Sequence, residues 1–249
     1  ALDARGKLRQ SGGMTDAPIR FLLNDTEIVL TEAGPGDTLL DFLRLGRGLT
    51  GTKEGCAEGD CGACTVLAGR LHGGALVYEP VNACIRFLAA CHGCHIVTVE
   101  HLKGPDGGLH PVQRAMVDHH ASQCGFCTPG FVMALYGLWM ENPAPDVVQV
   151  ETALQGNLCR CTGYRPILDA GQRMFDLPAT RMATDPVVQA LQGLRAQDAG
   201  LDYAAPNAAQ GGRVDSFHAP RTLDELAAGT ATFTPQDDDL ATRAFKGLW

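Results

Sequence analysis

The 249-residue sequence has no run of basic residues, and its 20 lysines and arginines are outnumbered by 28 aspartates and glutamates. The basic surface stripe that recognition of nucleic acid phosphates requires is therefore not indicated. The longest largely apolar stretch, residues 131–140, is far shorter than the roughly 20 residues of a membrane-spanning helix. The polar first 13 residues contain no apolar segment typical of secretory signals. We expect a soluble, cytoplasmic chain with no nucleic acid or membrane as partner.

Residue patterns that activate a substrate are also missing, because no Ser–His–Asp order and no pair of carboxylates stands out. We therefore expect no catalytic residue in this chain. What the sequence does contain is cysteine, ten residues in all. In a chain without a visible export signal, clustered cysteines more often bind metals or perform redox chemistry than form disulfides. The spacing of these cysteines is thus the main indication of function.

The hydrophobic pattern changes its period near residue 100. Upstream it alternates with a period of two, which predicts strands, around a single helix capped by Asp37 or Thr38. Downstream the period is 3.6, and prolines stand near the starts of the apolar segments, as is typical of helices. The predicted strands cover residues 19–23, 27–30, 65–67, 75–78 and 96–99. The predicted helices cover residues 39–45, 110–119, 129–139, 147–154 and 166–175.

This pattern predicts an α+β chain in which a small mixed domain, residues 17–100, precedes a helical domain, residues 101–182. Residues 1–16 show no periodicity and are expected to be a disordered extension. A composition rich in Ala, Gln, Gly and Asp predicts a linker over residues 183–215. The remaining residues, 216–249, are too few to fold alone and are expected to form an incomplete C-terminal segment.

The first cysteine group is Cys56-x4-Cys61-x2-Cys64, with Cys84 after nineteen intervening residues. This is the ligand spacing of plant-type [2Fe–2S] clusters. The loop contains glycines at positions 55, 59 and 62. A residue without a Cβ atom allows backbone N–H groups to approach sulfur. A zinc site and a set of buried structural thiols are the alternatives. The spacing favours an iron–sulfur cluster held by these four thiolates.

The second group is Cys124-x2-Cys127 followed by Cys159-x-Cys161. Each pair falls in a break between predicted helices, so two helix–break–helix units would each present two thiolates to one site. A thioredoxin-type redox pair is disfavoured, because no βαβ pattern surrounds Cys124 and Cys127. Spacing alone leaves two interpretations open for this group, an iron–sulfur cluster and a zinc ion.

The remaining thiols belong to the segment Cys91-His92-Gly93-Cys94-His95, which matches the C-x-x-C-H pattern of haem attachment. Such attachment takes place in exported proteins, and no export signal is visible here. A metal site formed with His92 and His95 is a further alternative. We interpret Cys91 and Cys94 as two free thiols beside a strand.

The residues around both cysteine groups resemble the iron–sulfur part of the molybdenum hydroxylases, the xanthine oxidase family, and most closely the xanthine dehydrogenase type. The resemblance covers about residues 17–180 and is carried by segments 51–56, 59–65, 82–84, 123–130 and 156–164. It implies a plant-type ferredoxin-like β-grasp domain followed by an all-α four-helix domain, each with one [2Fe–2S] cluster. By this resemblance the ligands are Cys56, Cys61, Cys64 and Cys84 for the first cluster, and Cys124, Cys127, Cys159 and Cys161 for the second.

The resemblance also implies partners. The helical-domain cluster would lie next to the molybdopterin of a separate large subunit, in a heterodimer or heterotetramer, with Gln123 near the pterin. Electrons from purine oxidation at that molybdenum centre would pass through both clusters to FAD and NAD. The alternatives are the small subunit of an aldehyde-, carbon monoxide- or N-heterocycle-oxidising relative and, from another class, a zinc-stapled interaction module.

Residues 217–226 resemble the opening of the FAD domain that follows the clusters in this family. The resemblance then fades, and no glycine-rich flavin loop follows before Trp249. We expect a truncated or frame-shifted gene product, or one half of a split subunit whose FAD domain is a separate polypeptide. FAD binding by these residues is accordingly not expected.

Overall fold

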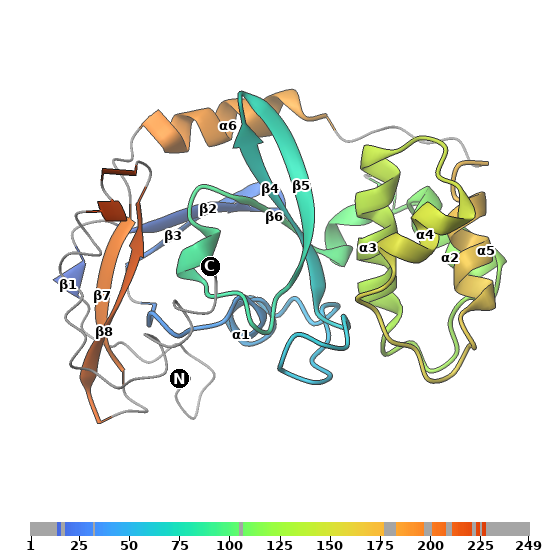
Figure 1. The fold of residues 1–249 in the computed structure, drawn as a ribbon, viewed down its shortest axis with the longest axis horizontal. Helices are drawn as coiled ribbons and strands as arrows, with labels where there is room; N and C mark the ends of the chain where they lie inside the picture. Colours follow the sequence, from blue (N-terminus) through green and yellow to red (C-terminus); the bar gives the residue numbers. More distant parts are fainter. Residues whose placement is uncertain are drawn as a thin grey trace.

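The computed structural model describes residues 14–15, 18–31, 33–104, 107–176, 183–196, 201–207, 211–220, 223–224 and 226–227. It combines strands and helices, with a five-stranded sheet in the middle of the molecule and a group of helices at one end (Figure 1). No helix among the described residues has both the length and the apolar character needed to cross a membrane.

The first part of the chain forms a mixed sheet. Its strands lie in the order β3-β2-β6-β4-β5, in which β2 and β6 run parallel and the other neighbours run antiparallel. All five predicted strands are present, and the predicted turn at Asn24-Asp25 joins the first two. The strands are β2 (Ile19–Leu23), β3 (Thr26–Leu30), β4 (Thr65–His72), β5 (Ala75–Asn82) and β6 (His95–Val97).

A short helix covers one face of this sheet. It begins as α1 (Leu39–Asp41) and continues as a π-helical turn, η1 (Phe42–Gly46). Of the two predicted caps, Thr38 is the one observed, since its Oγ1 accepts a hydrogen bond from the Asp41 N–H at 3.1 Å. The ring of Phe42 meets the ring of Phe21 edge-on at 5.8 Å in the core below. Two 3₁₀ turns, η2 (Ala89–Cys91) and η3 (Val99–Leu102), flank β6.

Four helices follow the sheet, each within two residues of its predicted bounds: α2 (Pro111–Asp118), α3 (Thr128–Glu141), α4 (Val147–Ala153) and α5 (Arg165–Arg173). Capping boxes at His110 and Asp146 fix the starts of α2 and α4. The long helix α3 contacts β4 and β5 on one side and α2 and α4 on the other. It therefore joins the helices to the sheet, and its buried face shares a core with Leu67 of β4.

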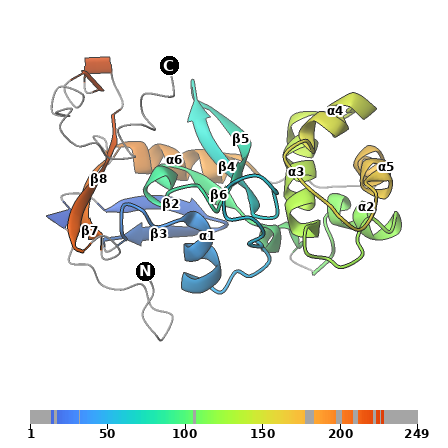
Figure 2. The ribbon, with the colours of Figure 1, turned by 60° about the horizontal axis from the view of Figure 1, so that its bottom comes forward.

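The stretch predicted to be a linker is instead part of the fold. The helix α6 (Asp185–Ala196) crosses the sheet on the face opposite α1 (Figure 2). Its Leu191 and Leu194 are buried in one cluster with Leu22 of β2 and Leu71 of β4. The Arg195 guanidinium donates a hydrogen bond to the Leu71 carbonyl oxygen at 2.6 Å. The prediction of a linker was wrong here because this apolar stripe is buried against the sheet.

A second, three-stranded sheet completes the described structure. Its strands β1 (Met14–Thr15), β7 (Leu201–Asn207) and β8 (Arg213–Ala219) lie in the order β1-β7-β8. Alternate residues of β7, Leu201, Tyr203 and Ala205, are buried in the main core. The prediction of disorder was therefore wrong for residues 14–15, while residues 1–13 and most of 221–249 lie outside the described part of the chain.

Two histidines, the buried His95 and the half-buried His110, make the stability of this fold depend on pH. The Tyr78 hydroxyl lies 2.6 Å from His95 Nδ1, and His95 Nε2 lies 2.8 Å from the Asn24 carbonyl oxygen. Because a carbonyl only accepts, Nε2 carries the proton and Nδ1 accepts from the tyrosine. Nδ1 of His110 accepts from the Val112 N–H at 3.2 Å as the cap of α2. Burial lowers the pKa of each histidine from 6.5 to about 4.

We expect the free energy of unfolding to be greatest above pH 6.5 and to decrease as the pH falls from there toward 4. The folded state favours the neutral rings, so acid protonates the unfolded chain first, at a cost of up to about 3 kcal/mol for His95 and less for the more exposed, better solvated His110. Denaturant unfolding between pH 7.5 and 5.5 measures this slope. The His110→Asn variant retains a capping side chain and should show a shallower slope. Equal stability at both ends of this range would contradict the prediction.

Candidate metal centres

The first cysteine loop, between η1 and β4, coils around the sulfur of Cys56. Its Sγ accepts hydrogen bonds from the backbone N–H groups of Glu58, Asp60 and Cys61 at 3.5, 3.3 and 3.4 Å. These bonds, that of Glu58 above all, lower the pKa of Cys56 to about 6. At Gly55 a Cβ atom would lie 2.7 Å from Cys61 Sγ, so only glycine leaves room there. The loop is thus built to stabilise a thiolate.

Two strands bring the other members of this group together. Cys64 immediately precedes β4 and Cys84 follows β5, and the register that pairs Thr65 with Asn82 places both cysteines at one end of the strand pair. Their side chains lie close enough to interact, and burial raises the pKa of Cys64 to about 12. Cys56 likewise interacts with the side chain of Cys61. The four predicted cysteines therefore meet as two pairs.

The second group also meets as two pairs, each drawn from both of its loops. Cys124 and Cys127 lie between α2 and α3, and Cys159 and Cys161 lie between α4 and α5. The Sγ atoms of Cys124 and Cys161 are 3.6 Å apart, and the side chains of Cys127 and Cys159 lie close enough to interact. Burial raises the pKa of Cys127 to about 12, whereas the N–H of Phe126 lowers the pKa of Cys124.

Two pairs per group fit a dinuclear cluster, in which two thiolates bind each iron. A single metal ion has a different requirement, because all of its ligands must converge on one point. No three Cys, His, Asp or Glu side chains in the described ranges converge in that way. The chemistry of the donors, thiols with N–H groups directed at sulfur, suits iron and inorganic sulfide.

Polar residues that the sequence analysis left without a role support both loops. The Tyr164 hydroxyl accepts a hydrogen bond from the Cys159 N–H at 3.0 Å, and Thr162 Oγ1 lies 3.1 Å from Cys159 Sγ. In the first loop, Asn82 donates to the Gly59 carbonyl oxygen at 2.5 Å. All three lie in or beside the segments that carried the family resemblance, but spacing alone gives no means of assigning such contacts.

Two of the four cysteines of the second group lie at the surface, beside exposed apolar side chains. Cys124, Cys161 and the predicted pterin neighbour Gln123 are exposed. Phe126, next to Cys127, is 48% exposed, and Leu158, next to Cys159, is 56% exposed. Large apolar side chains gathered on a surface are typical of an interface with another protein or domain.

The remaining two thiols, Cys91 and Cys94, form no disulfide and are fully buried beside β6. Cys94 Sγ accepts a hydrogen bond from Arg70 Nε at 3.1 Å. His92 Nδ1 accepts from the Arg20 N–H at 3.0 Å, and both ring nitrogens of His95 are hydrogen-bonded. These contacts disfavour the alternative metal site of Cys91, Cys94 and the two histidines.

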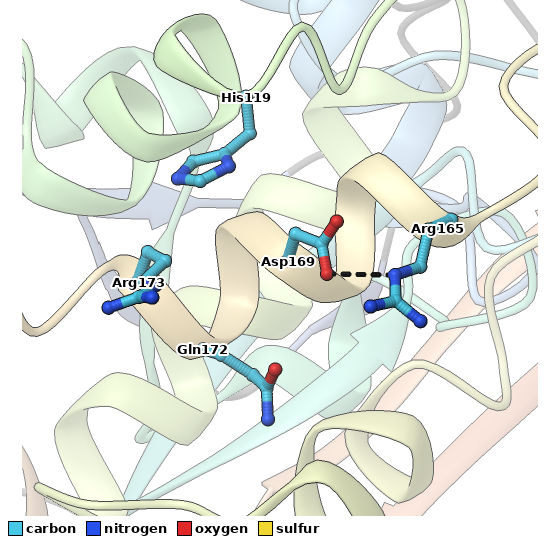
Figure 3. Close-up of a pocket in the computed structure, with 5 residues that line it drawn as sticks. All are labelled: His119, Arg165, Asp169, Gln172 and Arg173. Atoms are coloured by element: carbon cyan, nitrogen blue, oxygen red, sulfur yellow. Dashed lines mark ion pairs between the residues drawn. The ribbon is translucent and has the colours of Figure 1, made fainter.

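A separate hollow of about 350 Å³ lies between the end of α2 and α5 (Figure 3). It is lined by His119, Arg165, Asp169, Gln172 and Arg173. Arg165 is paired with Asp169 at 3.0 Å, and Arg173 with Asp176 at 3.1 Å. Both arginines of this hollow are thus paired with carboxylates.

Comparison with known families shows two matching domains. A family model described as a 2Fe-2S iron-sulfur cluster binding domain matches residues 22–94, and one described as a [2Fe-2S] binding domain matches residues 98–172. These ranges enclose the first and the second cysteine group. The chain therefore carries two [2Fe–2S] domains, which places it among iron–sulfur electron-transfer proteins.

Xanthine dehydrogenase from Emericella nidulans is 51% identical to the chain over 162 residues, which are 63% of this chain and 12% of that protein. Xanthine dehydrogenase/oxidase from Rattus norvegicus is 48% identical over 164 residues, 65% of this chain and 12% of that protein. Among solved structures, quinoline 2-oxidoreductase from Pseudomonas putida 86 is 37% identical, with a TM-score of 0.56 over 75% of this chain and 98% of that chain. Aldehyde oxidoreductase from Desulfovibrio desulfuricans is 38% identical, with a TM-score of 0.56. The match covers 64% of this chain and 17% of that chain.

The chain belongs to the molybdenum hydroxylase family that includes xanthine dehydrogenase, and it corresponds to the iron–sulfur part of those oxidoreductases. It spans about 12% of the length of the curated relatives it matches.

Proposed function

We propose that the eight cysteines of the two groups are the ligands of two [2Fe–2S] clusters. The first cluster would be held in a ferredoxin-like β-grasp domain by Cys56, Cys61, Cys64 and Cys84. The second would be held in a four-helix domain by Cys124, Cys127, Cys159 and Cys161. The observation that carries this assignment is the meeting of each group as two thiol pairs. When bound, each cluster takes up and releases one electron at a time.

The chain would serve as the electron conductor of a xanthine dehydrogenase-type enzyme in the cytoplasm. Its partner is a molybdopterin-binding subunit, in a heterodimer or heterotetramer, which would cover the exposed surface around Cys124 and Gln123. The electron acceptors are FAD, carried by a separate part of the enzyme, and NAD. Identity of about half of the aligned residues to xanthine dehydrogenases favours purine oxidation as the reaction served.

A second candidate is the iron–sulfur subunit of an N-heterocycle-oxidising enzyme. The solved structure of quinoline 2-oxidoreductase supports this candidate, because the match extends over 98% of the quinoline 2-oxidoreductase chain. Co-purification with the molybdenum-containing partner, followed by assays with xanthine and with quinoline, distinguishes the two. Activity with quinoline alone would favour the second candidate.

Metal analysis tests the assignment directly. Protein prepared or reconstituted without oxygen should contain about four irons and about four acid-labile sulfides per chain, since each [2Fe–2S] cluster contributes two of each. It should be coloured, and on reduction it should give two distinct electron paramagnetic resonance signals. Zinc without sulfide would contradict the proposal and would favour a zinc-stapled interaction module.

A further inference from the structure

The two cysteine loops are hydrogen-bonded to each other directly. The backbone N–H of Leu158 donates to the carbonyl oxygen of Cys61 at 3.0 Å. Cys61 belongs to the first group, and Leu158 is covalently bonded to Cys159 of the second. One hydrogen bond therefore links the backbone of a member of one group to the backbone next to a member of the other.

Asn157 lies beside this bond and is 5% exposed. Its Nδ2 donates to the Gly62 carbonyl oxygen at 2.9 Å and to Thr65 Oγ1 at 3.3 Å, although 95 residues separate Asn157 from Gly62. Its backbone N–H donates to the Leu154 carbonyl oxygen at 2.9 Å, at the end of α4. A buried amide is costly unless its polar atoms are paired, so these contacts fix where the side chain sits.

The loops are packed backbone against backbone at this point. A Cβ atom on Gly62 would lie 2.2 Å from the Gly156 carbonyl oxygen, and one on Gly130 of α3 would lie 2.1 Å from the Gly62 carbonyl oxygen. Gly62 also has a φ of 67°, a left-handed conformation that glycine adopts without strain. Gly62 and Gly130 have no room for a side chain, so the backbone and Asn157 together set the separation of the loops.

We propose that Asn157 is a positioning residue: it holds the Leu158 N–H against the Cys61 carbonyl oxygen and so fixes the separation of the two cysteine groups, across which an electron passes. The inference rests on the proposed function, because it concerns electrons moving between two clusters. The electron transfer between the two groups needs no further reactant. One electron given up at one group is taken up at the other, with no proton moved and no covalent bond made or broken.

The test uses the cluster-loaded protein and its Asn157→Asp and Asn157→Ala variants. The first is nearly isosteric, but its ionised carboxylate cannot donate to the Gly62 carbonyl oxygen. The matched control is Asn142→Asp, because within the described part of the chain the Asn142 side chain hydrogen-bonds to Gln149 and Ala144 and to neither cysteine loop. After rapid one-electron reduction, electron equilibration between the clusters should slow severalfold in both Asn157 variants. In the uncharged Asn157→Ala variant, iron content, resonance spectra and both reduction potentials should match the wild type.

Amide hydrogen exchange provides a second readout that needs no electron transfer. In the Asn157 variants, amide exchange at residues 156–160 should be roughly tenfold faster than in the wild type. This factor corresponds to the net free energy that one hydrogen bond contributes to stability. Unchanged equilibration and unchanged exchange would overturn the inference. If wild-type protein bound no iron, the proposed function would fail, whereas unprotected wild-type exchange at these residues would overturn the positioning role by itself.

Discussion

The Cys159→Ala variant is expected to lose about two of its roughly four irons and one of its two paramagnetic signals. Cys159 Sγ is paired with the Cys127 side chain and supported by Thr162. With three thiolates left, the second group cannot complete its dinuclear site, while the first group is built by a different loop and two strands. Metal analysis and resonance spectroscopy of the reduced protein measure both losses.

The Cys91→Ala variant is the matched control, since Cys91 is also a buried thiol but belongs to neither group. It should retain all of its iron and both signals, and lose only some stability through the small cavity left behind. The complementary Cys56→Ala variant should lose the other signal. If Cys91→Ala lost as much iron as Cys159→Ala, the assignment of the ligands would have to be abandoned.

The Gly130→Ala variant is expected to destabilise the chain by about 3 kcal/mol, the upper range for overpacking a rigid site. The added methyl group would lie 2.1 Å from the Gly62 carbonyl oxygen and 3.2 Å from Ala63 Cα. These neighbours are backbone atoms of a loop already hydrogen-bonded to Asn157, so they have little freedom to move aside. Denaturant unfolding of the metal-free and the cluster-loaded protein measures the change.

Gly137→Ala, on the same helix α3, separates crowding from helix propensity. A Cβ atom there would lie 3.2 Å from Leu67 Cδ2 and 3.4 Å from Pro80 Cγ, both side-chain atoms. Alanine is favoured over glycine in helices by about 1 kcal/mol, which should offset this milder contact and leave stability nearly unchanged. Equal effects of the two substitutions would show that the approach of Gly130 to Gly62 is not a tight one.

Much of this fold could be predicted from local sequence, because its elements carry strong local signals. Asn24-Asp25 marks a hairpin turn, Thr38 caps α1, and prolines open α2, α3 and α5. The later elements carry weaker ones. In α6 the apolar stripe that ends in Leu191 and Leu194 is short. In β7 small and polar residues interrupt the alternation of apolar and polar side chains. Local sequence therefore predicts neither element, because each depends on the sheet or core that buries it.

In the candidate site, too, local sequence predicts some features, while others depend on tertiary structure. Spacing identifies the two cysteine groups, since ligands on one loop must be near one another. It cannot identify the partners within a group, because the pairing of Cys124 with Cys161 depends on how α2, α3, α4 and α5 bring two loops together. The role of Asn157 was inaccessible for the same reason, as its acceptors lie more than ninety positions earlier in the chain.

The contact between the cysteine loops also bears on how the molecule forms during synthesis. While residues up to about 100 are being made, the Gly62 carbonyl oxygen has Thr65 as a neighbour but lacks Asn157, Gly130 and Gly156. Closing a chain segment of that length carries an entropic cost that must be met before those contacts form. We therefore expect the first cysteine loop to reach its final conformation only after the residues of the second group have been synthesised.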